Sequence, residues 1–110
     1  MRIEVIGEDP ISPQARTYAE YRVFAALTRF REAEKVQRVR VLLRPVNCGR
    51  DCEEVACTVT VGLAGSDSLR IRTKGPHAYA AINRAVERIG ISAETGMVDT
   101  KVFTVRGGER

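Results

Sequence analysis

The most constraining feature of this sequence is a repeated change in the spacing of its apolar residues. Segments in which apolar and polar residues alternate are followed, twice, by longer segments whose apolar residues recur every three or four positions. Alternation is typical of a strand with one buried face, and the longer spacing is typical of an amphipathic helix. The order predicts an α+β domain, β-α-β-β-β-α, with a four-stranded sheet covered on one face by two helices, as in double-stranded-RNA-binding domains.

The first half of the chain predicts a strand, a helix and a second strand. Residues 2–6 alternate and form the first strand. Ser12 followed by Pro13 is a typical helix start, because a hydroxyl caps free backbone N–H groups and proline fits the first helical position. The apolar stripe predicts that this helix ends near Arg31. Alternation over residues 36–44 then predicts a second strand whose outer face carries arginine.

The second half predicts a hairpin, a further strand and a second helix. Residues 45–54 are rich in proline, glycine, asparagine and acids and predict the loop of a long hairpin. Residues 55–63 and 69–74 alternate and predict the third and fourth strands. The second helix is expected to start after Gly75 and to end at Gly90, since glycine often follows the last helical turn.

The second helix is expected to have two different faces. Its buried stripe is predicted to contain Ile82, Ala85, Val86 and Ile89. The outer side is predicted to contain His77, Ala80, Ala81, Arg84 and Arg88. Small alanines between arginines would allow a phosphate backbone to approach the helix closely. Tyr79 is expected to lie half buried against the sheet.

The chain length of 110 residues supports one domain with its own core. We expect residues 1–90 to form this domain and residues 91–110 to form a C-terminal tail, with a loop over 91–96. Residues 98–106 have strand composition. They are expected to form either an extra strand at a sheet edge or a strand that pairs with another molecule, in which case residues 98–105 would join a homodimer. A frayed tail without strand pairing is an equal alternative.

The basic residues are mostly arginine and gather in two stretches. Fifteen of the eighteen Lys and Arg residues are arginine, and the formal net charge is +4. The stretches cover residues 16–44 and 70–88, and an acidic segment over 47–67 separates them. Arginine pairs bidentately with phosphate, so this pattern favours a polyanion, above all a nucleic acid, as partner.

Two motifs resemble the ribosome hibernation promoting factors, also called ribosome-associated inhibitor proteins. Ile11-Ser12-Pro13-x-x-Arg16-Thr17, followed by Glu20 and Arg22, is similar to the start of the family's first helix. Tyr79-Ala80-Ala81-Ile82-Asn83 is similar to the second-helix signature, aromatic-x-Ala-Ile-Asn/Asp. The two motifs have the expected separation, the resemblance covers residues 2–89, and the length fits the short form of the family.

The resemblance implies a factor that occupies the decoding region of the small ribosomal subunit and silences translation in stressed cells. It implies the small subunit and its rRNA as partners, contacted by basic residues of both helices. Arg16 and Arg22 match basic positions of the first motif. Position and charge add four further candidates, which are Arg29, Lys74, Arg84 and Arg88.

A second basic face is predicted on the open side of the sheet, without an assigned role. Its candidate residues are Arg38, Arg40, Arg70 and Arg72. Two alternative functions remain open from the sequence. One is a generic binder of structured RNA, and the other is a dimeric protein-interaction module without ribosome binding.

Catalysis, metal binding and a membrane location are not expected. The sequence contains no pairing of a nucleophile with a base and no phosphate-binding glycine loop, so we expect neither an enzyme nor a cofactor. Cys48 and Cys52 make a poor metal site, because Cys57 is expected to face inward and His77 is distant; a Cys48–Cys52 disulfide is an open alternative. Three cysteines and the lack of a long apolar run predict a cytoplasmic protein without membrane contact.

Overall fold

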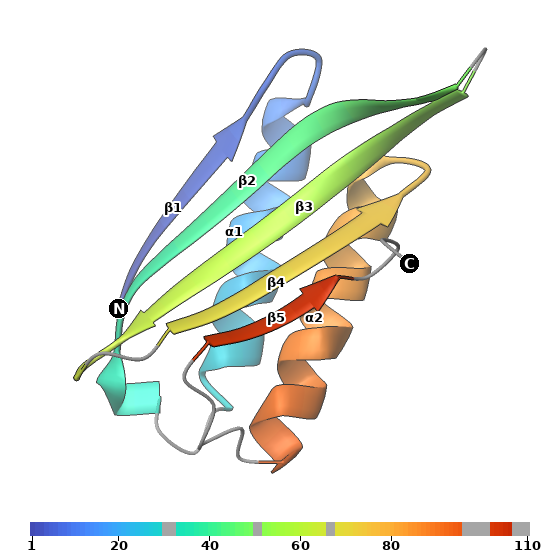
Figure 1. The fold of residues 1–110 in the computed structure, drawn as a ribbon. Helices are drawn as coiled ribbons and strands as arrows, with labels where there is room; N and C mark the ends of the chain where they lie inside the picture. Colours follow the sequence, from blue (N-terminus) through green and yellow to red (C-terminus); the bar gives the residue numbers. More distant parts are fainter. Residues whose placement is uncertain (30–32, 50–51, 66–67, 96–101, 107–110) are drawn as a thin grey trace.

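The computed structural model describes residues 1–29, 33–49, 52–65, 68–95 and 102–106, which form five strands and two α-helices (Figure 1). The elements are β1 (Arg2–Gly7), α1 (Pro13–Leu27), a short 3-10 helix (Ala33–Lys35), β2 (Val36–Gly49), β3 (Cys52–Leu63), β4 (Ser68–Gly75), α2 (Ala78–Thr95) and β5 (Val102–Arg106). The strands form one sheet in the order β1-β2-β3-β4-β5. The predicted α+β fold, with two helices on one face of β1–β4, is confirmed, and β5 is added at the edge.

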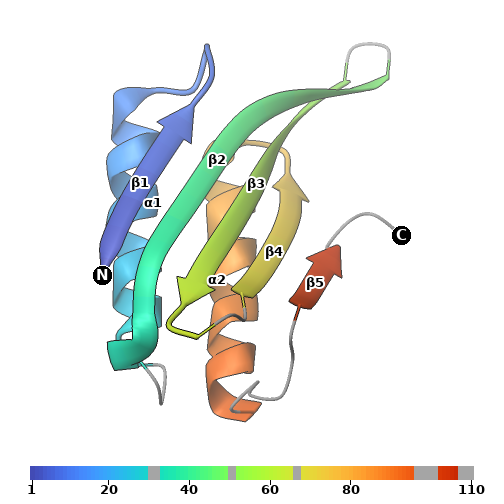
Figure 2. The same cartoon turned by 60° about the vertical axis from the view of Figure 1, so that its left-hand side comes forward.

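Each helix connects two neighbouring parallel strands. α1 links β1 to β2, and α2 links β4 to β5, while β3 runs antiparallel to both of its neighbours. Both helices therefore lie on the same face of the sheet, run in the same direction and begin at the same end (Figures 1 and 2). The other face of the sheet has no element of the described chain over it.

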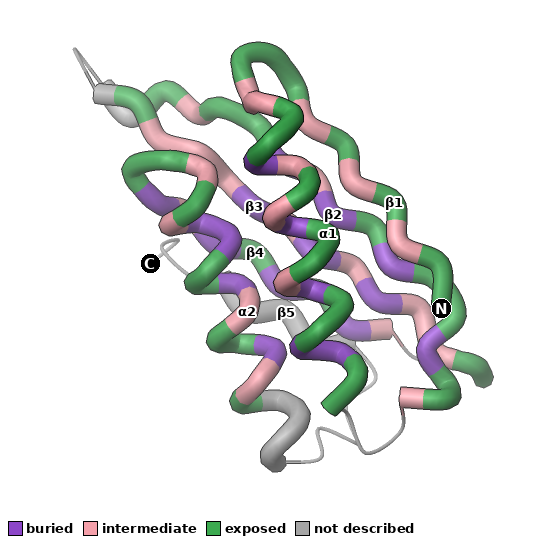
Figure 3. The backbone as a smooth tube through the Cα atoms, turned by 180° about the vertical axis from the view of Figure 1, so that it is seen from behind, coloured by how far each residue is buried: buried purple, intermediate pink, exposed green. Residues whose placement is uncertain are grey.

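The core lies between the inner face of the sheet and one stripe of each helix (Figure 3). Fully buried strand residues alternate with exposed or partly exposed ones. Burial of each large aliphatic side chain stabilises the fold by about 1.5–3 kcal/mol. The strand contribution comprises Val39, Val41, Leu43, Cys57, Val59, Val61, Leu69 and Ile71. The helix contribution includes Ala19, Val23, Leu27, Ala81, Ile82, Ala85 and Ile89.

Helix α1 begins as predicted and ends earlier than predicted. The hydroxyl of Ser12 accepts the backbone N–H of Ala15 at 3.1 Å. The helix ends at Leu27, and Thr28 caps its last turn with both its backbone N–H and its hydroxyl, which donate to carbonyl groups of that turn. Arg31, where the sequence predicted the end, lies outside the described residues.

Strands β2 and β3 form a longer ribbon than expected, so the prediction of a loop over residues 45–54 is wrong. Strand pairing continues to Gly49 opposite Cys52. Pro45 fits within β2 because pairing with β1 stops at Leu43. The backbone N–H and C=O groups of Leu43 point toward β1, and those of residue 45, two positions later, point to the same side. β1 no longer pairs there, so proline at this position loses no strand hydrogen bond by lacking an N–H.

Helix α2 continues past Gly90 to Thr95, so its predicted end at Gly90 is wrong, and most of the predicted 91–96 loop is helical. Gly90 does not adopt the positive φ that ends many helices. Glycine inside a helix costs about 1 kcal/mol relative to alanine. The buried stripe of α2, which extends to Ile89, offsets a cost of this size.

The C-terminal tail contributes β5, which pairs in parallel with β4. The pairing runs from Val102 opposite Ser68 to Arg106 opposite Arg72. Of the alternatives expected for this tail, the structure contains the edge strand within the chain. Residues 98–101 lie outside the described part.

Gly75 at the end of β4 and Gly90 inside α2 are expected to respond oppositely to alanine. At Gly75 an added Cβ would lie 2.7 Å from the backbone N of Ala81, whereas at Gly90 nothing lies within 4 Å. Gly75→Ala is expected to lower the free energy of unfolding by about 1–3 kcal/mol, because the α2 backbone must shift. Gly90→Ala is expected to raise it by about 0.5–1 kcal/mol. Urea denaturation followed by circular dichroism measures both, and a shift of the same sign would contradict the close contact between β4 and α2.

Candidate nucleic-acid interface

The two arginines of the first motif lie on different flanks of α1. Arg22 lies on the flank toward α2, since its guanidinium carbon is 5.8 Å from the centre of the Tyr18 ring, and Tyr18 contacts Tyr79 of α2. The side chain of Arg16 instead lies close to Gly7 of β1. Arg16 and Arg22 therefore do not form one cluster on α1.

The arginines of α2 lie on its flank away from α1. Asn83 faces α1, where its side-chain oxygen accepts the hydroxyl of Tyr18 at 2.7 Å. Arg84 points the other way and donates to the backbone carbonyl of Lys74, at the end of β4, at 2.5 Å. Arg88 follows one helical turn later and is exposed. The structure thus brings together Lys74 and Arg84, two of the predicted candidates.

Arg29 lies at the opposite end of the helix layer. It follows the last turn of α1, where its N–H donates to the carbonyl of Ala26, and its side chain is exposed. A helix of 15 residues is about 22 Å long, which separates Arg29 from Arg16 near the start. The six candidates on and beside the helices therefore form a spread basic surface and not one compact cluster.

The two sequence motifs meet at the contact between the helices. The rings of Tyr18 and Tyr79 pack edge to face with their centres 5.0 Å apart. Tyr79 is 40% exposed, so it is about half buried as predicted, and the ring contacts described for it are with Tyr18 of α1 and with His77. The aromatic and amide positions of the second motif hold α2 against α1 in this structure.

Ala81 is buried, contrary to the prediction that it faces outward. It is fully buried at the point where α2 crosses the end of β4. Its carbonyl accepts the hydroxyl of Thr73, itself almost fully buried, at 2.8 Å. This alanine allows close approach to β4, and it does not offer space to a phosphate.

His77 is exposed, and its Nδ1 accepts the N–H of Ala80 at 3.2 Å, which caps the start of α2.

Sequence reasoning missed two exposed aromatic residues on α1. Tyr21 is 69% exposed and Phe24 is 49% exposed. Both fall outside the three- and four-residue spacing of the buried helix positions. That spacing was the sequence signal that could have predicted their exposure. Exposed aromatic rings beside arginine are common in surfaces that contact unpaired RNA bases.

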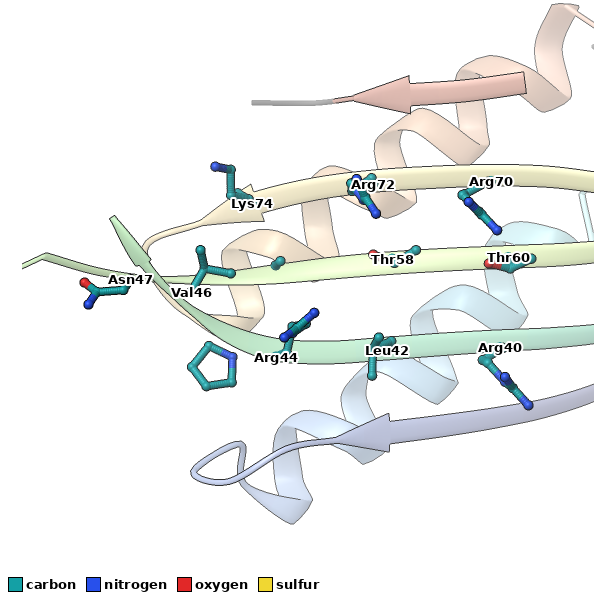
Figure 4. Close-up of a pocket in the computed structure, with 12 residues that line it drawn as sticks. Arg40, Leu42, Arg44, Val46, Asn47, Thr58, Thr60, Arg70, Arg72 and Lys74 are labelled. Atoms are coloured by element: carbon teal, nitrogen blue, oxygen red, sulfur yellow. The ribbon is translucent and has the colours of Figure 1, made fainter. Parts of the chain in front are cut away.

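The open face of the sheet contains a hollow of about 730 Å³ with a basic lining (Figure 4). Three of the four sheet candidates, Arg40, Arg70 and Arg72, line it. Arg38 does not, and lies with Arg2 in a separate depression at the other end of the strands. Arg44, another of the arginines that alternation predicts on the outer face of β2, lines the hollow too, as does Lys74, which follows the outward Arg70 and Arg72.

Three basic residues of this face form surface ion pairs with acidic neighbours. Arg40 lies 3.5 Å from Glu4, and Arg44 lies 3.9 Å from Glu8. Lys74 lies 4.0 Å from Glu54. The groups are about one third to three fifths exposed, and pairs of this kind contribute only about 0–1 kcal/mol each. An incoming phosphate could displace them at low cost.

The structure gives no sign of a metal site or a membrane span in the part of the chain that it describes. Among these residues no group of three His, Cys, Asp or Glu side chains is placed to bind a metal ion. None of the described helices is long and apolar enough to span a membrane. Cys57 is buried in β3, and the side chains of Cys48 and Cys52 lie outside the described part.

Comparison with known proteins gives a structural match without a sequence match. Neither protein-family models nor curated proteins match this chain. A solved structure of a ribosomal subunit interface protein from Coxiella burnetii superposes with a TM-score of 0.68 and 16% sequence identity, over 90% of this chain and 100% of that one. The two chains share one fold. At this identity the likeness concerns the fold alone.

Burial of the Cys57 thiol predicts a loss of stability at alkaline pH. Desolvation raises the pKa of Cys57 from 9.0 to about 12. As the pH rises, the thiol of the unfolded chain loses its proton at a lower pH than the buried thiol of the folded chain. The free energy of unfolding is therefore unaffected by this group below pH 9, and it falls by up to about 1.4 kcal/mol per pH unit as the pH rises toward 12. Chemical denaturation between pH 8 and about 11 is expected to show a steeper decline for the wild type than for Cys57→Ala. Parallel declines would contradict the burial of this thiol.

Proposed function

We propose that this protein binds the small ribosomal subunit and silences translation by occupying its decoding region. The observation that carries this proposal is the fold match to a ribosomal subunit interface protein along that protein's whole length. The two motifs that resemble ribosome hibernation factors support it further. The structure packs Tyr79 and Asn83 of the second motif against Tyr18, which lies within the stretch of the first. A partner of this kind would place the protein in the cytoplasm.

The proposed rRNA contacts come from the basic side chains around the helices. Arg29 and Arg88 are exposed and form no hydrogen bond or ion pair among the described residues, so their guanidinium groups are available to phosphate. The exposed Tyr21 and Phe24, elsewhere on the surface of α1, could stack on unpaired bases. Arg84 has a structural contact at Lys74 and would bind RNA through its remaining N–H groups.

The proposed mechanism is occupancy without chemical reaction. Arginine side chains would neutralise rRNA phosphates and release counterions, and the folded body would exclude mRNA and tRNA from the same space. Helix N-termini carry partial positive charge, and both α1 and α2 begin at the same end of the molecule (Figure 1). These partial charges would add to the attraction of the basic side chains for RNA.

Sedimentation with purified small subunits tests the proposal. The wild-type protein is expected to pellet with the subunits at low salt, with log K falling against log salt by roughly 0.7–0.9 per phosphate contact. Arg88→Glu and Arg22→Glu are each expected to weaken binding about tenfold, since each removes one charge-assisted contact. Arg2→Glu, on β1, provides a control with the same change in net charge.

Failure of the wild-type protein to pellet with small subunits at low salt would rule out the proposal. Equal affinity for a plain RNA duplex and for small subunits would replace it with a generic binder of structured RNA. Equal losses for Arg88→Glu and Arg2→Glu would remove the helix surface from the interface. Circular dichroism of each variant shows whether the fold is retained.

A further inference from the structure

The open face of the sheet has the shape of a shallow groove with a floor of small residues. β3 lies between β2 and β4, and its outward side chains are Ala56, Thr58 and Thr60 (Figure 4). Longer side chains stand on both neighbouring strands. Two strand spacings separate β2 from β4, so the groove is about 10 Å wide between strand axes.

The wall on β4 is a regular row of positive charges. Arg70, Arg72 and Lys74 occupy alternate positions and point to the same side. Alternate residues of a strand are about 7 Å apart. Successive phosphates of an extended nucleic-acid strand have a similar spacing. Arg70 is exposed and forms no hydrogen bond or ion pair among the described residues, so it can bind an anion without breaking an internal contact.

The positive charge of the arginines on β2 is partly neutralised by acidic residues on the side away from β3. Arg40 and Arg44 pair with Glu4 and Glu8, which lie on β1 and in the loop that follows it. On β4, Lys74 pairs in the same way with Glu54 of β3, whereas Arg70 pairs with no acidic group among the described residues. The uncompensated positive charge therefore includes Arg70, on the side of the groove away from β1. An anionic chain would be guided along β3 and would be kept away from β1.

We infer that this groove binds the backbone of a single-stranded RNA along β3, as a site separate from the helix surface proposed above. Arg70 and Arg72 would contact phosphates from one wall, and Arg40 from the other. The hydroxyls of Thr58 and Thr60 can donate to phosphate oxygens from the floor. The site does not depend on ribosome binding and stands if that proposal fails.

The geometry favours a single RNA strand over a duplex or an acidic peptide. A duplex is too broad to reach the floor of a groove this narrow. A peptide would gain little from strand addition, because β3 is paired on both edges and offers only its side chains. The described residues that line the groove include no aromatic side chain, so the bases would face solvent and binding would not depend on sequence.

Fluorescence anisotropy with the full-length protein and a labelled oligouridine of about ten nucleotides tests this inference without ribosomes. Arg70→Glu is expected to weaken binding about tenfold and to reduce the magnitude of the salt slope by roughly 0.7. Arg2→Glu is the matched control, because it is also an exposed strand arginine but lies outside the groove. It is expected to change the affinity less than twofold.

Several results would overturn the inference. Equal weakening by Arg70→Glu and Arg2→Glu would show that binding depends only on net charge. Absence of oligouridine binding by the wild type, or tighter binding of an RNA duplex, would exclude a single-strand groove. Competition by polyglutamate as effective as that by unlabelled oligouridine at equal charge would assign the groove to an acidic protein. Thermal melting confirms that both variants are folded, and ribosome sedimentation of Arg70→Glu shows whether the two sites act separately.

Discussion

Burial of one face of the sheet under α1 and α2 is the constraint on which the rest of this structure depends. Strand side chains alternate between two faces, so the apolar residues of β2, β3 and β4 can be buried only if their neighbours point outward. In β2 the residues between Val39, Val41 and Leu43 are Arg40 and Leu42. The same packing that makes the core therefore creates the open basic face.

The junction between β4 and α2 links the two basic surfaces. Thr73 and Gly75 allow α2 to pack closely against the end of β4. Arg84 then reaches the carbonyl of Lys74, two residues beyond Arg72, where β4 pairs with β5 for the last time. The groove wall on β4 therefore ends beside the basic flank of α2. Both helices also begin at this end, and their partial positive charges add to the field there.

Local spacing predicted most of the fold and less of its boundaries. The strand and helix order, the Ser12 cap and the inward residues of the strands follow from side-chain periodicity, which neighbours in sequence specify. The errors at residues 45–54, Gly90 and Ala81 share a physical cause. Whether proline, glycine or alanine fits a strand, a helix or a buried position depends on the neighbouring elements. Pro45 fits in β2 because β1 has ended, Gly90 fits in α2 because the helix is packed on the core, and Ala81 is buried because β4 lies close to it.

By itself the sequence determined the α+β class, the identity of the buried strand residues and an arginine-rich surface suited to a polyanion, because these depend on composition and on short-range periodicity. Only the tertiary structure decided how the arginines are grouped. It separated Arg16 from Arg22 and Arg38 from Arg40, and it placed residues of β2 and β4 on either side of one groove. The physical reason is that strand pairing and helix packing set distances between residues far apart in the chain, and no local pattern encodes those distances.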